Sequence, residues 1–336
     1  MRVYEIQSAL GIDALTVTER DEPTPAPNQV IVRVRAVSLN YRDLSAVKGK
    51  TPNLSLPLVP MSDGAGEIVA IGAEVSRVKV GDRVAGIFMQ SFLDGELIEE
   101  YRASALGGAL DGMFAEYVAL DEQGVVQIPA HLSFEEAACL PCAGVTAWNA
   151  LVTVGSIKSG DTVLVLGTGG VSLFALQFAL AAGARVIATS SSDEKLERMR
   201  KLGASEGVNY RTTPEWGERV RELTDGRGVD HVVEVGGAGT LNQSLKAVRA
   251  SGLVSLIGVL TGGSAEINTA NILAQNIRVQ GIYVGSRRMF KEMNRAIEIN
   301  KIKPVIDRVF EFEEAQVAFR YMEAGAHFGK IVVRVE

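Results

Sequence analysis

A glycine-rich turn at Gly167, Gly169 and Gly170 is the feature of this sequence best suited to bind a charged ligand. It follows an apolar strand-like segment and opens an apolar helix-like segment, 171–182. Such a turn collects backbone N–H groups and the positive end of a helix dipole at one place, where a pyrophosphate group can bind. We expect Gly169, Gly170 and Val171 to form this site for a dinucleotide, although glycines also form ordinary tight turns.

The elements around the turn predict a doubly wound parallel sheet. Ser172 replaces the third glycine of the usual pattern and is small enough for a helix to pack closely on a strand. Strand-like segments then alternate with helix-like ones, which is typical of α/β folds with a parallel sheet. The expected strands are 162–166, 185–189, 207–210, 229–235, 253–259 and 278–284, and the expected helices are 171–182, 194–202, 215–224 and 241–250.

The first part of the chain has short alternating segments and no long helix, which predicts a barrel-like β domain. Its expected strands are 3–6, 15–18, 30–37, 66–72, 82–88 and 114–120, with a short helix at 40–47. A capping box at 133–136 predicts a long apolar helix after it. Helices are expected at 288–300 and 312–325, and the alternating segment 329–335 is expected to return to the first domain. Segment 89–112 has no period and is read as a lid or as a surface loop.

Composition limits the classes of function. A length of 336 residues suggests two domains, and 47% apolar with 22% charged residues is ordinary for a soluble protein. A net charge of −6 argues against nucleic acid as a partner. Glycines split the uncharged run 163–184, so we expect no membrane span, and no signal peptide is recognised. With two cysteines, Cys139 and Cys142, the chain fits a reducing cytoplasm.

Several motifs together resemble the medium-chain dehydrogenase/reductase superfamily, in particular its zinc-free, quinone oxidoreductase-like branch. They are AVSLNYRDL, PMSDGAGEIVAIG, VGDRVAG, FAEYV, LPCAGVTAWNAL, VLVLGTGGVS and the terminal GKIVV. The resemblance implies a GroES-like catalytic domain, 1–143 with 285–336, and a Rossmann NADP-binding domain, 144–284. It also implies an active site between them and a homodimer formed through the strand 278–284.

The zinc ligands of related alcohol dehydrogenases are largely missing. By the resemblance, Asn40 replaces a cysteine and Ser62 replaces a histidine, while Cys142 stands at the position of a further ligand. None of the three histidines lies in a ligand spacing. An asparagine and a serine do not complete a tetrahedral zinc site, so we expect no bound metal. A poor site made by Cys142 with Asp43 or Asp63 is the alternative left open.

The former ligand positions are then candidates to face the reactants. We expect Asn40 and Ser62 to contact nicotinamide or substrate, and Tyr41 to donate a hydrogen bond or form an aromatic wall. Arg42 and Asp43 could instead form a structural pair. Further cofactor contacts implied by the resemblance or by strand ends are Thr146, Gly236, Val259 and Lys330.

The end of the second Rossmann strand predicts the cofactor. NAD enzymes of this architecture carry a carboxylate there to bind the ribose 2′-hydroxyl, but this chain has Ser190 followed by Ser191. Lys195 adds a cation, and in NADP-using relatives a lysine and a tyrosine, here Tyr210, contact the 2′-phosphate. Asp193 is interpreted as a helix N-cap. The expected cofactor is NADP.

Hydride transfer without a metal favours acceptors that spread the incoming charge. Quinones and enones do so through their conjugated systems, so a few oriented hydrogen bonds suffice. We therefore expect an NADPH-dependent oxidoreductase acting on a quinone, an enone or a related carbonyl compound. The alternatives are an alcohol or aldehyde dehydrogenase of the same superfamily, and a non-enzymatic NADPH-binding protein.

Overall fold

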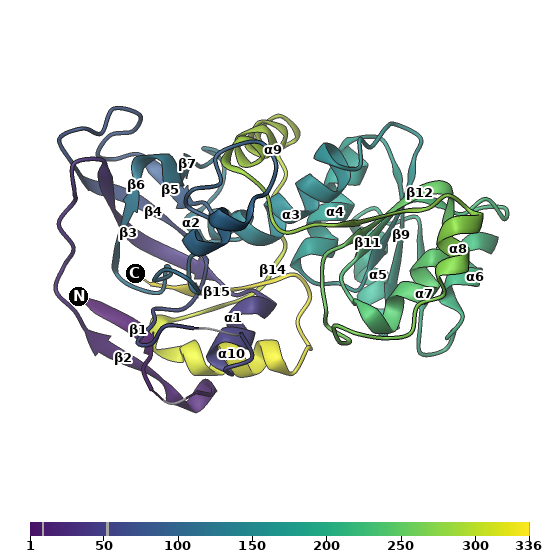
Figure 1. The fold of residues 1–336 in the computed structure, drawn as a ribbon, viewed down its shortest axis with the longest axis horizontal. Helices are drawn as coiled ribbons and strands as arrows, with labels where there is room; N and C mark the ends of the chain where they lie inside the picture. The colour runs from purple at the N-terminus through teal and green to yellow at the C-terminus, as the bar shows by residue number, and fades with distance from the viewer. Residues whose placement is uncertain (9, 52–53, 336) are drawn as a thin grey trace. The chain divides into compact units, whose positions relative to one another are not determined.

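Two large β-sheets organise the chain, and each belongs to its own unit. The computed structural model describes residues 1–8, 10–51 and 54–335. One unit consists of Met1–Val145 with Val284–Glu336, and the other of Thr146–Tyr283. Figure 1 labels most of the helices and strands of both units.

The first unit contains a seven-stranded sheet that is antiparallel except for the pair formed by β14 and β15. Its strands are β3 (Gln29–Ser38), β4 (Asp63–Ile71), β5 (Arg83–Gly86), β6 (Tyr117–Asp121), β7 (Val125–Gln127), β14 (Ile306–Phe310) and β15 (Lys330–Arg334). A separate antiparallel pair is formed by β1 (Arg2–Ile6) and β2 (Leu15–Glu19). Val332 in β15 lies opposite Ser38 in β3, so the expected return of the chain end to the first sheet is confirmed.

The helical elements of the first unit are short except for two near the chain end. They are α1 (Tyr41–Val47), α2 (Phe134–Ala138), α9 (Arg287–Asn300) and α10 (Ala315–Glu323), with short turns η1 (Ile12–Ala14), η2 (Glu99–Ser104), η3 (Glu122–Gly124) and η6 (Phe312–Glu314). The capping box before α2 is confirmed, because Ser133 and Glu136 exchange hydrogen bonds. The single long helix expected after it is wrong: wide π-helical turns interrupt it. The run continues as η4 (Leu140–Gly144), α3 (Val145–Trp148) and η5 (Asn149–Thr153).

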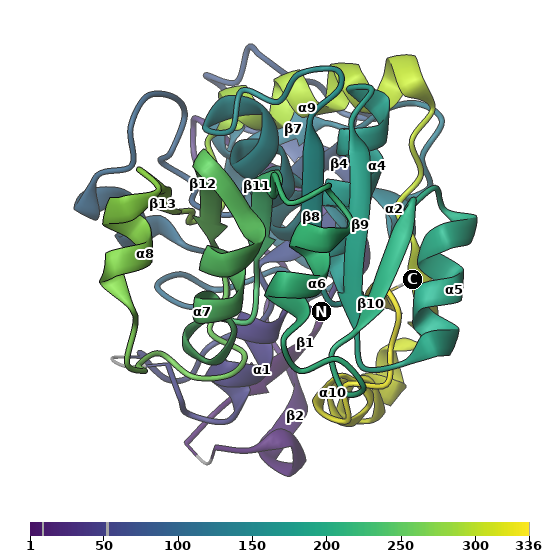
Figure 2. The same ribbon diagram turned by 90° about the vertical axis from the view of Figure 1, so that its right-hand side faces the viewer.

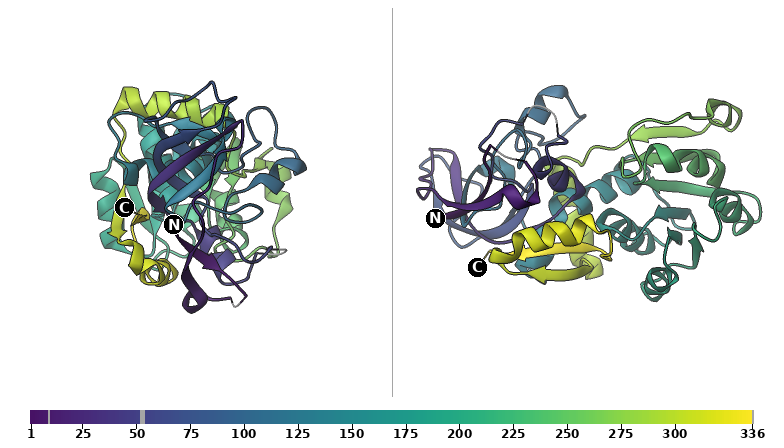
Figure 3. Two further views of the ribbon diagram at one scale, coloured as in Figure 1. Left: turned by 90° about the vertical axis from the view of Figure 1, so that its left-hand side faces the viewer. Right: turned by 90° about the horizontal axis from the view of Figure 1, so that it is seen from below.

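An aromatic cluster joins the two ends of the chain in the core of the first unit. The ring of Phe114 stacks on Tyr4 with centroids 4.5 Å apart and meets Phe312 edge-on at 5.5 Å. Burial of these large rings contributes to the hydrophobic stabilisation of this unit. Gln316 of α10 also donates to the carbonyl of Leu15, and Figure 3 shows α10 beside the first strands.

The second unit is a six-stranded parallel sheet with its central strands buried on both faces. Its strands are β8 (Thr162–Leu166), β9 (Arg185–Ser190), β10 (Glu206–Asn209), β11 (Val229–Glu234), β12 (Val248–Leu256) and β13 (Arg278–Gly281). Its helices are α4 (Gly170–Ala181), α5 (Asp193–Lys201), α6 (Trp216–Glu222), α7 (Ala238–Ala247) and α8 (Thr269–Ala274). The expected doubly wound sheet is confirmed, and β14 and α8 are elements that the sequence interpretation missed.

The strand order of this sheet is β10-β9-β8-β11-β12-β13, as Figure 2 shows. The chain builds one half outward from β8 and then crosses back to start the other half at β11. In open α/β sheets, ligands bind beyond the carboxyl ends of the strands at such a reversal. The fold therefore places the glycine turn after β8 and the loop after β11 beside the expected ligand position.

Within the described residues, no helix has both the length and the apolar character needed to cross a membrane.

Candidate functional site

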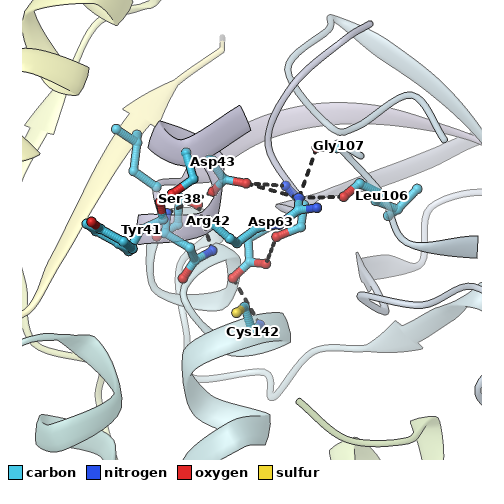
Figure 4. Close-up of polar contacts among 12 residues, drawn as sticks. Ser38, Tyr41, Arg42, Asp43, Asp63, Leu106, Gly107 and Cys142 are labelled. Carbon is cyan, nitrogen blue, oxygen red and sulfur yellow. Dashed lines mark hydrogen bonds and ion pairs between the residues drawn. The ribbon is translucent and has the colours of Figure 1, made fainter. Parts of the chain in front are cut away.

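A polar cluster of the first unit lies at the start of α1, and Figure 4 labels Arg42, Asp43 and Asp63 of it. Its members are Asn40, Arg42, Asp43, Ser62, Asp63 and Lys330. Asn40 immediately precedes α1 and is largely buried. Its backbone N–H donates to Asp43 Oδ2 at 2.8 Å, and its carboxamide Oδ1 accepts a hydrogen bond from Lys330 Nζ at 2.7 Å. Lys330 Nζ also donates to the carbonyl of Leu39 at 2.7 Å. These bonds fix Asn40 and Lys330 relative to one another.

Asp43 ties α1 to two other segments of the unit. Its carboxylate is fully buried, accepts a hydrogen bond from the backbone N–H of Ser62 at 3.3 Å and pairs with Arg42 at 3.2 Å. Arg42 in turn donates to the carbonyls of Leu106 and Gly107 at 2.7 and 3.0 Å. Burial raises the pKa of Asp43, and the Arg42 charge opposes that rise. The structural pairing of Arg42 with Asp43 is therefore present.

Asp63, the first residue of β4, is a second fully buried carboxylate. It accepts hydrogen bonds from Ser62 Oγ at 2.7 Å and from the backbone N–H of Cys142 at 3.0 Å. Burial raises the pKa of Asp63 to about 6, although the positive charge of Lys330 lowers it. Ser62 is also fully buried, so its hydroxyl serves Asp63. Tyr41, by contrast, is 46% exposed.

These side chains do not fit a zinc site. Asn40 and Ser62 supply neutral amide and hydroxyl oxygens where zinc relatives supply soft or imidazole ligands. Burial raises the pKa of the Cys142 thiol. Among the described residues, no group of three or more His, Cys, Asp or Glu side chains is arranged to hold a metal ion. The alternative of a poor site made by Cys142 with Asp43 or Asp63 has only two such ligands and stays a prediction.

A strained residue lies between the two carboxylates in the sequence, and nothing in the sequence predicts it. Met61 is fully buried and has a φ of 70°, which is unfavourable for a residue with a side chain. Gly107 and Gly112 pack directly against its backbone, because a Cβ atom on either glycine would collide with Met61. The N–H of Met113 donates to the Met61 carbonyl at 2.8 Å. The end of segment 89–112 thus holds the turn that presents Ser62 and Asp63.

The glycine turn of the second unit has the shape that a phosphate group requires. Gly167 has a φ of 69°, and Gly169 has open space where a side chain would stand. Gly170 and Val171 begin α4 directly after this turn. Ser172 is buried and its hydroxyl donates to the carbonyl of Leu166 at 2.6 Å. This small residue lets the helix pack closely on β8. The glycine turn and the start of α4 together fit a nucleotide pyrophosphate.

The residues expected to recognise the ribose lie together at the ends of β9 and β10. Ser190 pairs in register with Asn209, and its carbonyl accepts a hydrogen bond from the N–H of Tyr210 at 3.1 Å. Ser190 is buried and its hydroxyl accepts from the N–H of Ser192 at 3.2 Å, whereas Tyr210 is 42% exposed. Ser191 and Lys195 are half-buried beside them. Position 190 carries a serine, where NAD enzymes of this architecture carry a carboxylate.

The interpretation of Asp193 as an N-cap is wrong. Ser192 is the residue that caps α5, because its side chain accepts a hydrogen bond from the N–H of Lys195 at 3.3 Å. Asp193 is the first helical residue, where its charge favours the helix dipole, and it accepts from Asn209 Nδ2 at 2.8 Å. Its carboxylate is thus bound to the neighbouring strand end.

A buried glutamate that the sequence interpretation did not identify organises the end of β11. Glu234 Oε1 accepts hydrogen bonds from the N–H groups of Gly236 and Gly237 at 2.7 and 3.0 Å. It also accepts from Thr240 Oγ1 at 2.6 Å, and Oε2 accepts from the hydroxyl of Ser244. In the first turn of α7, the N–H of Gly239 donates to Thr261 Oγ1 at 2.9 Å. Glu234 therefore fixes the loop that contains Gly236.

The two remaining expected cofactor residues differ in exposure. Val259, in the loop after β12, is 58% exposed. Thr146 lies in α3 and is buried. Their contacts with a cofactor stay predictions, as do those of the other expected site residues.

Comparisons with known proteins identify the family. Residues 26–130 match the alcohol dehydrogenase GroES-like domain, and residues 170–298 match the zinc-binding dehydrogenase domain. A zinc-type alcohol dehydrogenase-like protein of Schizosaccharomyces pombe is 46% identical over 97% of this chain and 96% of its own. A quinone oxidoreductase of Pseudomonas aeruginosa is 33% identical over 96% of each chain. A solved structure described as an NAD-dependent alcohol dehydrogenase superposes with a TM-score of 0.92 at 35% identity over all of both chains. The chain belongs to the medium-chain dehydrogenase/reductase superfamily and is an oxidoreductase with a nicotinamide cofactor.

Proposed function

We propose that this protein is an NADPH-dependent oxidoreductase that reduces quinones, enones or related carbonyl compounds without zinc. The observation that carries the proposal is the polar cluster around Asn40. At the positions where zinc relatives have ligands, Asn40 is bonded to Lys330 and Ser62 is bonded to Asp63. Side chains engaged in this way support chemistry that needs oriented dipoles rather than a Lewis acid.

The residues of the second unit would hold the cofactor. Gly169, Gly170 and Val171 would bind its pyrophosphate at the start of α4. Ser190, Ser191, Lys195 and Tyr210 would surround a ribose 2′-phosphate, which a carboxylate at position 190 would repel. When bound, NADPH would supply a hydride ion with its electron pair. Gly236, Val259 and Thr146 are further proposed contacts.

The residues of the first unit would contact or position the acceptor. Asn40 would lie beside nicotinamide or acceptor, and Tyr41, which is partly exposed, would donate a hydrogen bond or form a wall. For Ser62 we propose a positioning role, because its buried hydroxyl is bonded to Asp63. The proton that completes reduction would come from solvent.

The test is a screen of NADPH oxidation against quinones, enones and aldehydes after dialysis with a chelator, with NADH as the matched control. We expect turnover of a conjugated acceptor with NADPH, unchanged by the chelator. Alcohol oxidation with NAD⁺ that the chelator abolishes and Zn²⁺ restores would instead identify an alcohol dehydrogenase, as the solved structure compared above is described. Tight NADPH binding with no turnover of any acceptor would indicate a non-enzymatic binding protein.

We also propose that the protein is a cytoplasmic homodimer formed through β13. All four residues of this edge strand are exposed, and Leu273 in α8 nearby in the sequence is 85% exposed. An exposed strand edge is a ready surface for pairing with a second copy, and Val279 adds an exposed apolar side chain to it. Sedimentation equilibrium of the protein and of a Val279→Pro variant tests this: we expect a dimer and a weakened dimer, and a monomeric wild-type protein would contradict it.

A further inference from the structure

A buried cation lies in the polar cluster of the first unit, against a residue that replaces a zinc ligand. Lys330 is only 3% exposed. Its Nζ donates to Leu39 O and to Asn40 Oδ1, each at 2.7 Å. Because full burial of an ammonium is unfavourable without partners, this arrangement needs a compensating environment.

Two fully buried carboxylates supply that environment. Asp43 and Asp63 carry two negative charges, and Lys330 and Arg42 carry two positive charges. Burial raises the pKa of each carboxyl group, and the positive charge of Lys330 opposes this rise at both. The cluster is therefore balanced in charge by the side chains of this chain alone.

Lys330 also fixes the orientation of the Asn40 amide. The ammonium is donor-only, so it selects Oδ1 of Asn40 and turns the amide NH₂ group away from itself. The NH₂ group makes a long hydrogen bond, 3.4 Å, to the Ser38 carbonyl and also hydrogen-bonds the Asp63 carboxylate. Lys330 is therefore the partner that holds Oδ1 of this amide, while Ser38 and Asp63 accept from its NH₂ group.

We propose that Lys330 is the resident cation of this site, with the electrostatic role that a metal ion has in zinc relatives. It is a positioning residue that acts through Asn40, and its charge excludes a divalent cation from the cluster. The inference rests on the zinc-independent reaction proposed above. In that reaction, the ammonium group of Lys330 would be the fixed positive charge of the site.

The direct test restores zinc-type ligands with and without Lys330. The variant Asn40→Cys/Ser62→His joins a thiol and an imidazole to Cys142, and Co²⁺ is the probe because thiolate ligation gives it a strong absorption band. A unit charge and a divalent ion ~4 Å apart repel enough, even in water, to weaken binding by about thirtyfold. We therefore expect Lys330→Met in this background to tighten Co²⁺ binding by about thirtyfold or more.

Lys48→Met is the matched control, because Lys48 forms a surface ion pair with Glu323 in the same unit. It should leave Co²⁺ affinity within about twofold, since exposed charges are well screened. Lys330→Arg should keep binding weak, as its charge remains. Equal Co²⁺ affinity with Lys330 and with Met at this position would overturn the proposal, and so would stoichiometric zinc in the wild-type protein.

A second background keeps the test decisive where the double variant does not fold. Asn40→Cys alone places one new thiol near Cys142 and is compared with Asn40→Cys/Lys330→Met by the same titration, with the same expected direction. Neither titration uses turnover, so failure of the acceptor screen and failure of this inference are separate results. In turnover, Lys330→Met should lower kcat with little change in KM for NADPH, and Lys330→Arg should restore part of it.

Discussion

Replacement of Glu234 tests how the loop after β11 is held in place. The carboxylate is fully buried and accepts two backbone and two side-chain hydrogen bonds. The backbone carbonyl of the same residue accepts from the N–H groups of Ile257 and Gly258 at 2.8 and 3.2 Å. One residue therefore joins the loops that contain Gly236 and Val259, both expected to contact the cofactor.

The cost of each replacement follows from these bonds. Glu234→Ala leaves the N–H groups of Gly236 and Gly237 without their acceptor, at about 1–3 kcal/mol each. The bonds share one carboxylate and are not additive, so we expect a total of about 3–5 kcal/mol. Glu234→Gln keeps an acceptor oxygen and can donate to Ser244. It loses mainly the extra strength that a negative charge gives these hydrogen bonds, so the free energy of unfolding should fall by about 1–2 kcal/mol.

The assay combines urea unfolding without cofactor with a fluorescence titration of NADPH. We expect Glu234→Ala to raise the Kd for NADPH by about tenfold or more and Glu234→Gln to raise it less. Affinity falls in proportion to the fraction of molecules in which the loop has the conformation that binds NADPH. Glu197→Ala is the control, since Glu197 forms an exposed pair with Arg200. This change should lower the free energy of unfolding by under about 0.5 kcal/mol. A Glu234→Ala variant as stable as the wild-type protein, with the same Kd, would refute this reasoning.

Three further predictions address other parts of the molecule. Burial disfavours ionised Asp230, but hydrogen bonds from Arg227 and Arg249 outweigh it and hold its pKa well below the usual range. Asp230→Asn should therefore lower the free energy of unfolding by about 2 kcal/mol near neutral pH. This difference from the wild-type protein should shrink as pH falls below about 4, because the carboxyl group of the unfolded wild-type chain is then protonated. Urea unfolding measured at several pH values checks this, and a difference that does not change with pH contradicts it. Gly112→Ala would place a Cβ atom against the Pro60 and Met61 carbonyls. It should lower the free energy of unfolding by about 1–3 kcal/mol and reduce turnover. Gly263→Ala adds its Cβ atom in open space and should change neither stability nor turnover. Ser190→Asp should lower kcat/KM for NADPH by about tenfold or more through repulsion of the 2′-phosphate, with Ser190→Asn as the neutral control; equal effects of both variants would speak against a phosphate at this place.

The second unit could be predicted well because its signals are local. Apolar strands such as β8 are buried on both faces and read as continuous apolar runs, and the glycine turn marks where α4 begins. Most of its predicted strands and helices lie within a few residues of the observed ones. β14 was missed because Asp307 and Arg308 interrupt its apolar character, so only its pairing with β15 identifies it as a strand.

The site of the first unit could be predicted only in part. Resemblance identified Asn40 and Ser62, but the bond between Asn40 and Lys330 spans 290 positions in the sequence, and no local pattern indicates it. The strain at Met61 likewise depends on glycines more than 40 residues away. The roles of Asp63 and Glu234 follow from complete burial with several donors, which tertiary structure alone supplies.

The most direct test of the proposed function compares kcat/KM for NADPH and NADH, with one conjugated acceptor, in protein whose metal content has been measured after dialysis with a chelator. The account predicts a clear preference for NADPH, with full activity in protein that contains far less than one zinc ion per chain. A preference for NADH, or activity proportional to bound zinc, would contradict it.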